Sequence, residues 1–264
     1  MHIRLDTRRA IVTGSTAGIG LAIASGLAAA GAHVTLTGRT QARVDEAIAT
    51  IARQMPDARL AGVAGDLGTR EGAQRLIADV PETDILVNNL GIFEPKAFFD
   101  IPDEDWLRFF EVNVMSGVRL SRHYAQGMAK RGWGRVQFIS SESALQIPAE
   151  MVQYGATKTA QLAVSRGLAE TLAGTGVTVN AVLPGPTRSE GVGGFFGKIA
   201  AERGVSQESV ERDFIATHRP TSLIRRLASV KEVANLCVYL ASEQASATTG
   251  AAMRVDGGVV RSIA

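Results

Sequence analysis

The chain has 264 residues, of which 45% are apolar and 20% charged, and its formal net charge is +2. This length allows one large α/β domain or two small ones, and the small net charge argues against a nucleic-acid partner. No apolar run reaches the ~18–20 residues that cross a bilayer. The N-terminus lacks a signal-peptide pattern, and the single cysteine, Cys237, cannot form an internal disulfide. We expect a soluble, cytoplasmic protein without membrane contact.

The first part of the chain has the pattern of a βαβ unit. A β-prone run at residues 10–13 precedes a glycine-rich turn, an Ala/Leu-rich helix that ends at Gly31, and a second strand at residues 32–37. Glycines allow a backbone to approach a pyrophosphate closely, and the N–H groups at a helix N-terminus bind anions. The alternative is a turn needed only for packing. The predicted cofactor-binding residues here are Gly14, Ser15, Thr16, Gly18, Ile19 and Gly20.

The end of the second strand indicates which dinucleotide binds. An acidic residue there would accept hydrogen bonds from the ribose hydroxyls of NAD, whereas an arginine would pair with the 2′-phosphate of NADP. The sequence reads Thr37-Gly38-Arg39-Thr40, and the first acid is Asp45. Arg39 therefore favours NADP, with NAD as the alternative cofactor; an ordinary solvated arginine is the simpler interpretation of the same residue.

Helices and strands continue to alternate through the middle of the chain. We expect helices at 41–54 and 69–79, a weak strand at 60–65 that leads into Asp66-Leu67, and a buried strand at 84–87. That buried strand ends in Asn88-Asn89-Leu90-Gly91, where the Asn and Gly residues are expected chiefly to shape a turn.

A long helix is predicted from Asp103 to Lys130, with Asn113 in its middle. Asparagine is unfavourable inside a helix because its amide competes for backbone hydrogen bonds. A buried Asn113 therefore indicates either a kink or a place where a water is held.

The next strand and helix carry the candidate catalytic groups. Residues 134–139 form a strand that delivers Ser140 and Ser141 to the edge where open α/β sheets bind ligands. The following helix runs to about Gly174 and carries Tyr154 and Lys158 one turn apart on one face. A cation about 4 Å from the phenol would lower the tyrosine pKa by a few units at most, toward proton transfer at neutral pH. The motif alone is weak evidence, because an ordinary surface helix can carry both residues.

After a strand at 177–183 and the turn Pro184-Gly185-Pro186-Thr187, the composition changes. The segment 188–219 begins with a glycine-rich part around Phe195-Phe196 and continues with a charged part. We expect the two phenylalanines to be exposed. We expect a mobile substrate lid, the alternative being a subunit contact. A helix at 230–241 and a strand with its turn at 251–258 follow. This alternation predicts a single doubly wound Rossmann domain over 1–264, with helices on both faces of a parallel sheet.

Six stretches of sequence occur in the order and spacing of one family: Thr13–Gly20, Asn88–Gly91, Asn113, Ser141, Tyr154-x-x-x-Lys158 and Pro184-Gly185. Over essentially its whole length the chain resembles the short-chain dehydrogenases/reductases (SDRs). The resemblance implies a sheet of about seven parallel strands, a homotetramer or homodimer, and NAD or NADP as cofactor.

The resemblance also implies a role for each matching residue. Tyr154 would be the proton donor, and Lys158 would lower its pKa and bind the nicotinamide ribose. Ser141 would hold the substrate carbonyl, and Asn113 would hold a water in a proton relay to Lys158. Asp66 and Leu67 would lie near the adenine. Further cofactor contacts are implied for Asn89, Gly91, Pro184, Gly185, Thr187 and Ser189, the last standing where many members have threonine.

The leading hypothesis is therefore an NADP-dependent oxidoreductase that interconverts a ketone and a secondary alcohol by hydride transfer. A non-catalytic dinucleotide-binding regulator on the same fold is one alternative, and a 3-oxoacyl thioester reductase is a more specific one. A sugar-nucleotide epimerase usually needs a larger C-terminal domain. The four histidines and Cys237 show no metal-ligand spacing, so no metal site is predicted.

Overall fold

The fold is built on one parallel sheet of seven strands. The computed structural model describes residues 2–263, apart from the side chain of Phe195. The strands lie in the order β3-β2-β1-β4-β5-β6-β9, and every neighbouring pair is parallel. Their bounds are β1 Arg9–Val12, β2 His33–Gly38, β3 Leu60–Ala64, β4 Ile85–Asn88, β5 Gly134–Ile139, β6 Val177–Pro184 and β9 Ala252–Val255. The predicted fold class, a doubly wound Rossmann domain, is confirmed.

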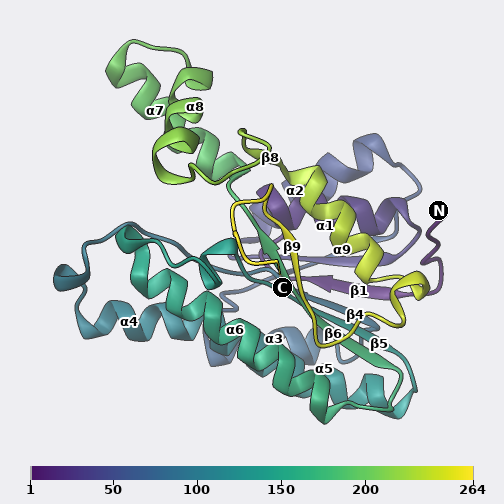
Figure 1. Ribbon diagram of the computed structural model, residues 1–264. Coiled ribbons are helices and arrows are strands. Elements are labelled where there is room, and N and C mark those ends of the chain that lie inside the picture. The colour runs from purple at the N-terminus through teal and green to yellow at the C-terminus, as the bar shows by residue number, and fades with distance from the viewer. Residues whose placement is uncertain (1, 264) are drawn as a thin grey trace.

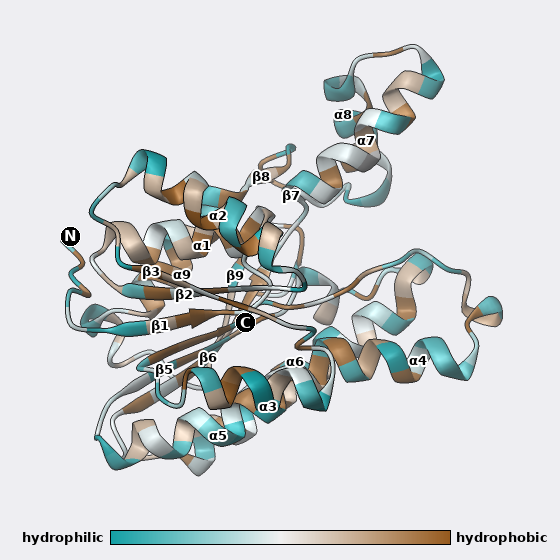
Figure 2. Ribbon diagram, turned by 180° about the vertical axis from the view of Figure 1, so that it is seen from behind, coloured by the Kyte–Doolittle hydropathy of each residue, from teal (hydrophilic) through white to brown (hydrophobic). Residues whose placement is uncertain are grey.

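Helices cover both faces of the sheet (Figure 1). One layer consists of α1 (Gly18–Ala29), α2 (Gln41–Gln54) and α9 (Val230–Leu240), and the opposite layer of α3 (Arg70–Asp79), α5 (Ser116–Lys130) and α6 (Val152–Thr171). Short 3₁₀ turns lie at Phe98–Asp100, Glu142–Ala144, Ala149–Met151 and Glu243–Ala245. The apolar strands lie between the two layers (Figure 2), which explains why β4, β5 and β6 are buried along their whole length.

The strand order reverses between β1 and β4, since β2 and β3 extend the sheet on one side and β5, β6 and β9 on the other. The register aligns the carboxyl ends of the central strands, with Asn88 beside Phe138 and Ile139 beside Val182. Ligands of such sheets bind in the crevice outside these ends. The loops that follow β1, β4, β5 and β6 therefore meet at one place.

The predicted helix from Asp103 to Lys130 is in fact interrupted. Helix α4 (Asp103–Phe110) passes into a π-helical turn at Glu111–Met115, and α5 begins at Ser116. Asn113 lies inside this turn and is 1% exposed. Its side chain bonds to the backbone of Ile92 and to the Thr157 hydroxyl, contacts that the widened turn makes room for. The expected kink thus takes the form of a π turn.

The segment expected to form a lid is largely helical, and its glycine-rich part lies in α7. Strand β7 (Thr187–Arg188) pairs with β8 (Ala228–Ser229), and between them α7 (Glu190–Arg203) and α8 (Gln207–His218) stand out from the body of the molecule (Figures 1 and 2). Ser189 caps α7 and Gly204 ends it in the left-handed conformation. Phe196 is buried in a small core between the two helices, so it is not exposed as predicted, and the Phe195 side chain lies outside the described residues.

Within residues 2–263, no helix combines the length and the apolar character that crossing a bilayer requires.

Candidate active site

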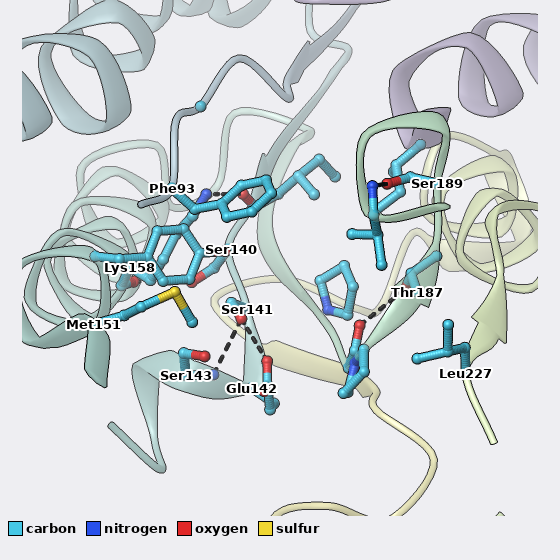
Figure 3. Close-up of a pocket in the computed structure, with 18 of the residues that line it drawn as sticks. Phe93, Ser140, Ser141, Glu142, Ser143, Met151, Lys158, Thr187, Ser189 and Leu227 are labelled. Carbon is cyan, nitrogen blue, oxygen red and sulfur yellow. Dashed lines mark hydrogen bonds between the residues drawn. The ribbon is translucent and has the colours of Figure 1, made fainter. Parts of the chain in front are cut away.

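A cavity of about 360 Å³ opens at the carboxyl ends of β4, β5 and β6 (Figure 3). Apolar walls come from Phe93 in the loop after β4, from Met151 before α6, and from Phe196 and Phe214 in the α7–α8 segment. Polar groups converge between these walls: Ser141, Glu142, Tyr154, Lys158 and Arg219. An apolar cavity with a few convergent polar groups is the usual form of a small-molecule site.

The turn between β1 and α1 fits a dinucleotide phosphate. Gly14 and Gly18 have positive φ values of 61° and 56°. A Cβ at Gly20 would lie 2.4 Å from the Gly14 carbonyl oxygen, so only glycine fits there. No side chain caps the N-terminus of α1, which leaves its first N–H groups available to an anion.

The Ser15 hydroxyl is used inside the protein. It donates to the Val12 carbonyl at 2.8 Å and accepts from the Thr37 N–H at 2.9 Å, which fastens β1 to β2. The Ser15 backbone N–H donates to the Thr37 carbonyl at 3.0 Å, so the strand pairing uses this donor as well.

The end of β2 has the features of a 2′-phosphate site. A Cβ at Gly38 would lie 2.4 Å from Cγ2 of Thr16, so an acidic side chain at this position would displace that threonine. Arg39 is exposed, and among residues 2–263 it makes no hydrogen bond or ion pair. The free guanidinium of Arg39 is a group that could pair with a phosphate.

The other predicted residues of the cofactor groove differ in placement. Asn89 donates from Nδ2 to the carbonyls of Thr13 and Gly14, at 2.9 and 3.0 Å, and thus shapes the turn as expected. Asp66 is exposed and accepts from the Gly68 N–H, whereas Leu67 is buried in the core. Neither of these two lines the cavity.

Tyr154 and Lys158 lie on the face of α6 that forms one wall of the cavity. The Lys158 Nζ atom is 5.5 Å from the centroid of the Tyr154 ring. It donates to the Ile139 carbonyl at 2.9 Å and to Oε1 of Gln161 at 3.3 Å. The lysine is thereby fixed between the end of β5 and its own helix.

Burial determines the ionisation of this pair. Burial raises the pKa of Tyr154 well above its ordinary value, a hydrogen bond from Ser141 opposes this rise, Glu142 adds to it, and Arg219 opposes it. Burial also lowers the pKa of Lys158 to about 7. Lys158 is not among the groups that shift the Tyr154 pKa in the chain alone, so the expected lowering by this lysine is not seen and desolvation dominates. The phenol stays protonated at neutral pH, as a proton donor must.

The two serines at the end of β5 have different roles. The Ser140 hydroxyl donates to the Lys158 carbonyl at 2.8 Å and so joins β5 to α6. Ser141 presents its hydroxyl in the cavity (Figure 3), where it donates to Oε2 of Glu142 at 2.5 Å and accepts from the Ser143 N–H. Both serines line the cavity, and the family resemblance assigns the substrate contact to Ser141.

A buried ion pair beside Ser141 was not predicted from the sequence. The Nε atom of Arg219, at the end of α8, lies 2.9 Å from Oε1 of Glu142, and the two side chains are 9% and 6% exposed. The pair joins the turn after β5 to the α7–α8 segment. No local pattern relates these residues, because they are 77 positions apart in the sequence.

The turn after β6 completes the cavity wall. A Cβ at Gly185 would lie 2.5 Å from the Asp256 carbonyl oxygen, so the backbone passes close to the loop after β9. The Thr187 hydroxyl donates to the Gly185 carbonyl at 2.8 Å, and Ser189 lies beside Gly18 of the phosphate turn. The candidate nucleotide groove and the polar cavity are therefore continuous.

Comparisons with known proteins agree with this geometry. Residues 14–260 match a family model described as "Enoyl-(Acyl carrier protein) reductase". The chain is 49% identical over 263 residues to "Uncharacterized oxidoreductase YvaG" of Bacillus subtilis, with both chains fully covered. It is 34% identical to "Dehydrogenase/reductase SDR family member 4" of Bos taurus, over 96% of this chain and 88% of that one. The chain belongs to the short-chain dehydrogenase/reductase family.

Among solved structures, the SDR fold is shared with L-sorbose reductase from Gluconobacter frateurii, which was crystallised with NADPH and L-sorbose. The TM-score is 0.92 at 32% identity, and both chains are fully covered. The present chain is thus an oxidoreductase of the SDR family, which acts on CH–OH groups.

About half of the predicted site residues line the cavity of this SDR. Those that line it are Ile19, Asn89, Gly91, Ser141, Tyr154, Lys158, Pro184, Gly185, Thr187 and Ser189. Those outside its lining are Gly14, Ser15, Thr16, Gly18, Gly20, Arg39, Asp66, Leu67 and Asn113. Sequence reasoning missed Glu142, Arg219 and Gln161. For Gln161 a signal existed, since a polar residue three positions after Lys158 shares its helix face.

Proposed function

We propose that the protein is an NADP-dependent SDR that interconverts a ketone and a secondary alcohol. The observation that carries this proposal is the convergence of Ser141, Tyr154 and Lys158 on one cavity that continues into the phosphate-binding turn. A bound nicotinamide would supply or accept the hydride. The NADPH in the related L-sorbose reductase supports the choice of cofactor.

The chain's own groups supply the proton chemistry. In the reductive direction, the Tyr154 phenol gives its proton to the carbonyl oxygen while the carbonyl carbon gains a hydride. The Ser141 hydroxyl donates a hydrogen bond to the same oxygen, for which it turns away from Glu142. The Lys158 ammonium stabilises the phenolate that remains, and Asn113 holds the π turn against Ile92 and Thr157.

A panel of ketones, aldehydes and secondary alcohols tests the proposal. We expect a change in nicotinamide absorbance with NADPH and at least one carbonyl whose size suits a cavity of about 360 Å³. Tight binding of NADPH without turnover of any member of a broad panel would contradict the proposal and favour a non-catalytic regulator.

The preference for NADP is expected to depend on Arg39. The change Arg39→Ala should weaken NADP binding about 10- to 100-fold and leave NAD affinity nearly unchanged, because only NADP carries the 2′-phosphate. Titration of both cofactors into the purified protein measures this difference. The matched control is Arg53→Ala, which removes another exposed arginine, at the far end of α2. An equal effect on both cofactors, or a wild type that prefers NAD, would contradict the assignment.

We propose that residues 188–219 form a substrate lid within a single domain. Phe196, Phe214 and Arg219 of this segment line the cavity, and Glu190 lies 3.7 Å from Arg43 of α2. We expect amide hydrogen exchange in α7 and α8 to slow when NADPH and substrate bind, because closure buries these helices. Full protection in the free protein would identify the segment as fixed.

The proposed assembly is a homotetramer or homodimer. The large apolar side chains Phe99 and Leu107, near and on α4, are 96% and 70% exposed, which supports a subunit contact there. The mass of the particle in solution tests this assembly, and a monomer at high concentration would contradict it.

A further inference from the structure

Gln161 is a buried polar residue beside the candidate catalytic lysine. It lies on α6, one turn after Lys158, and is 2% exposed. Its Nε2 atom donates to the backbone carbonyl of Asn113 at 2.5 Å, and its Oε1 atom accepts from Nζ of Lys158 at 3.3 Å. One amide thus joins the π turn directly to the lysine.

Chemistry fixes the orientation of this amide. The Asn113 carbonyl can only accept, and the Lys158 ammonium can only donate. A reversed amide would place two acceptors against each other on one side and two donors on the other. The oxygen of Gln161 therefore faces Lys158 in the charged state of the lysine.

The family resemblance implies a water, held by Asn113, between that residue and Lys158, and the Gln161 amide contacts both of these residues. We propose that Gln161 is a positioning residue, which holds Lys158 at the cavity wall and stabilises its ammonium form. The use of that ammonium in turnover rests on the proposed function. The positioning itself does not, since it follows from contacts within the chain.

The surroundings of Lys158 make this acceptor important. Among residues 2–263, the other acceptor of the Lys158 ammonium is the Ile139 carbonyl, at 2.9 Å, and burial disfavours the charged lysine. The other titratable groups among the described lining residues of the cavity are Tyr154, Glu142 and Arg219, and the last two pair with each other. The π turn and the loop after β4 face Lys158 with the neutral residues Asn113 and Gly91. Removal of the Gln161 oxygen should therefore lower the pKa of Lys158.

Two substitutions should move the pKa of Lys158 in opposite directions. Gln161→Leu removes the acceptor, which disfavours the ammonium and should lower the pKa by about one unit. Gln161→Glu places a carboxylate at the same point, which favours the ammonium and should raise the pKa. Gln161→Met, closer in shape, replaces the leucine variant if that variant fails to fold.

The measurement is an NMR titration of the protein labelled with ¹³C at the lysine ε-carbons. The chain has five lysines, so five signals are expected, and Lys158→Met identifies the relevant one. Gln153→Leu is the matched control, because Gln153 is also buried on α6 but donates to the Glu94 carbonyl instead. It should leave the pKa of Lys158 unchanged.

Shifts of opposite sign in the leucine and glutamate variants would support the inference. An unchanged pKa in both, or a shift of the same sign in both and in the Gln153 control, would overturn it. The pH–rate profile separates this inference from the proposed function. If turnover needs the ammonium, activity should fall as pH rises through the lysine pKa, and this limb should move to lower pH in Gln161→Leu. If the NMR pKa of Lys158 shifts but the limb of the pH–rate profile does not move, only the use of the Lys158 ammonium in turnover would be overturned.

Discussion

Tyr154→Phe is expected to lose about 10²- to 10⁴-fold in carbonyl turnover and to keep its affinity for NADPH. The substitution removes only the phenol oxygen, which is the atom that carries the transferable proton. The ring remains to pack edge-on against Phe93, whose centroid is 6.4 Å away. Steady-state turnover and cofactor titration of the same preparation measure the two effects separately.

Tyr124→Phe is the control for this substitution. Tyr124 is also buried, and its hydroxyl donates to the Val80 carbonyl at 2.7 Å, away from the cavity. Loss of that hydrogen bond should cost about 1 kcal/mol of the free energy of unfolding and leave turnover unchanged. Equal losses of turnover in the two variants would mean that Tyr154 acts through structure alone.

The second large effect is expected at the buried ion pair. Arg219→Met leaves the Glu142 carboxylate buried without its partner, which should lower the free energy of unfolding by about 3–5 kcal/mol. The double variant Glu142→Gln/Arg219→Met should recover much of this loss, because it removes both charges. Urea unfolding of the wild type, the two single variants and the double variant measures the four free energies of unfolding that a double-mutant cycle requires.

A surface ion pair provides the comparison. Arg226 and Glu232 are 55% and 42% exposed and lie 2.7 Å apart, so Arg226→Met should change stability little. If Arg219→Met proves as mild as this control, then the pair between Glu142 and Arg219 does not hold the α7–α8 segment to the cavity.

The sheet and most helices were predictable because their signals are local. A short apolar run predicts the buried strand at 84–87, and Gly31 predicts the end of the first helix. The π turn at Glu111–Met115 could not be located, because it depends on contacts of Asn113 with Ile92 and Thr157. The sequence indicates an irregularity only through the presence of an asparagine inside a predicted helix.

The α7–α8 segment shows tertiary packing prevailing over helix propensity. Each interior glycine of α7 costs about 1 kcal/mol relative to alanine, so the sequence favours a loop there. The observed helix is stabilised by Ser189 at its N-terminus and by apolar contacts of Phe196 with α8. Such contacts between distant positions leave no periodic trace in a glycine-rich stretch.

In the candidate site, too, some residues were found from the sequence and others are brought together only by the fold. Tyr154, Lys158 and Ser141 were assigned from the family resemblance, since their spacing alone also fits a surface helix and the strand end offers Ser140 as well as Ser141. Glu142 with Arg219 could not be paired in advance, because the fold alone brings them together. Gln161 was within reach, since its spacing from Lys158 places both on one helix face.

Single-turnover reduction with NADPH that carries deuterium at both C4 positions tests most directly whether Tyr154 and the cofactor act on one carbonyl in this cavity. We expect deuterium on the carbinol carbon of the product, and a transfer rate in Tyr154→Phe that is lower by at least about 10²-fold. Product without deuterium at that carbon, or a variant rate within a few-fold of the wild type, would contradict hydride transfer assisted by proton donation from Tyr154.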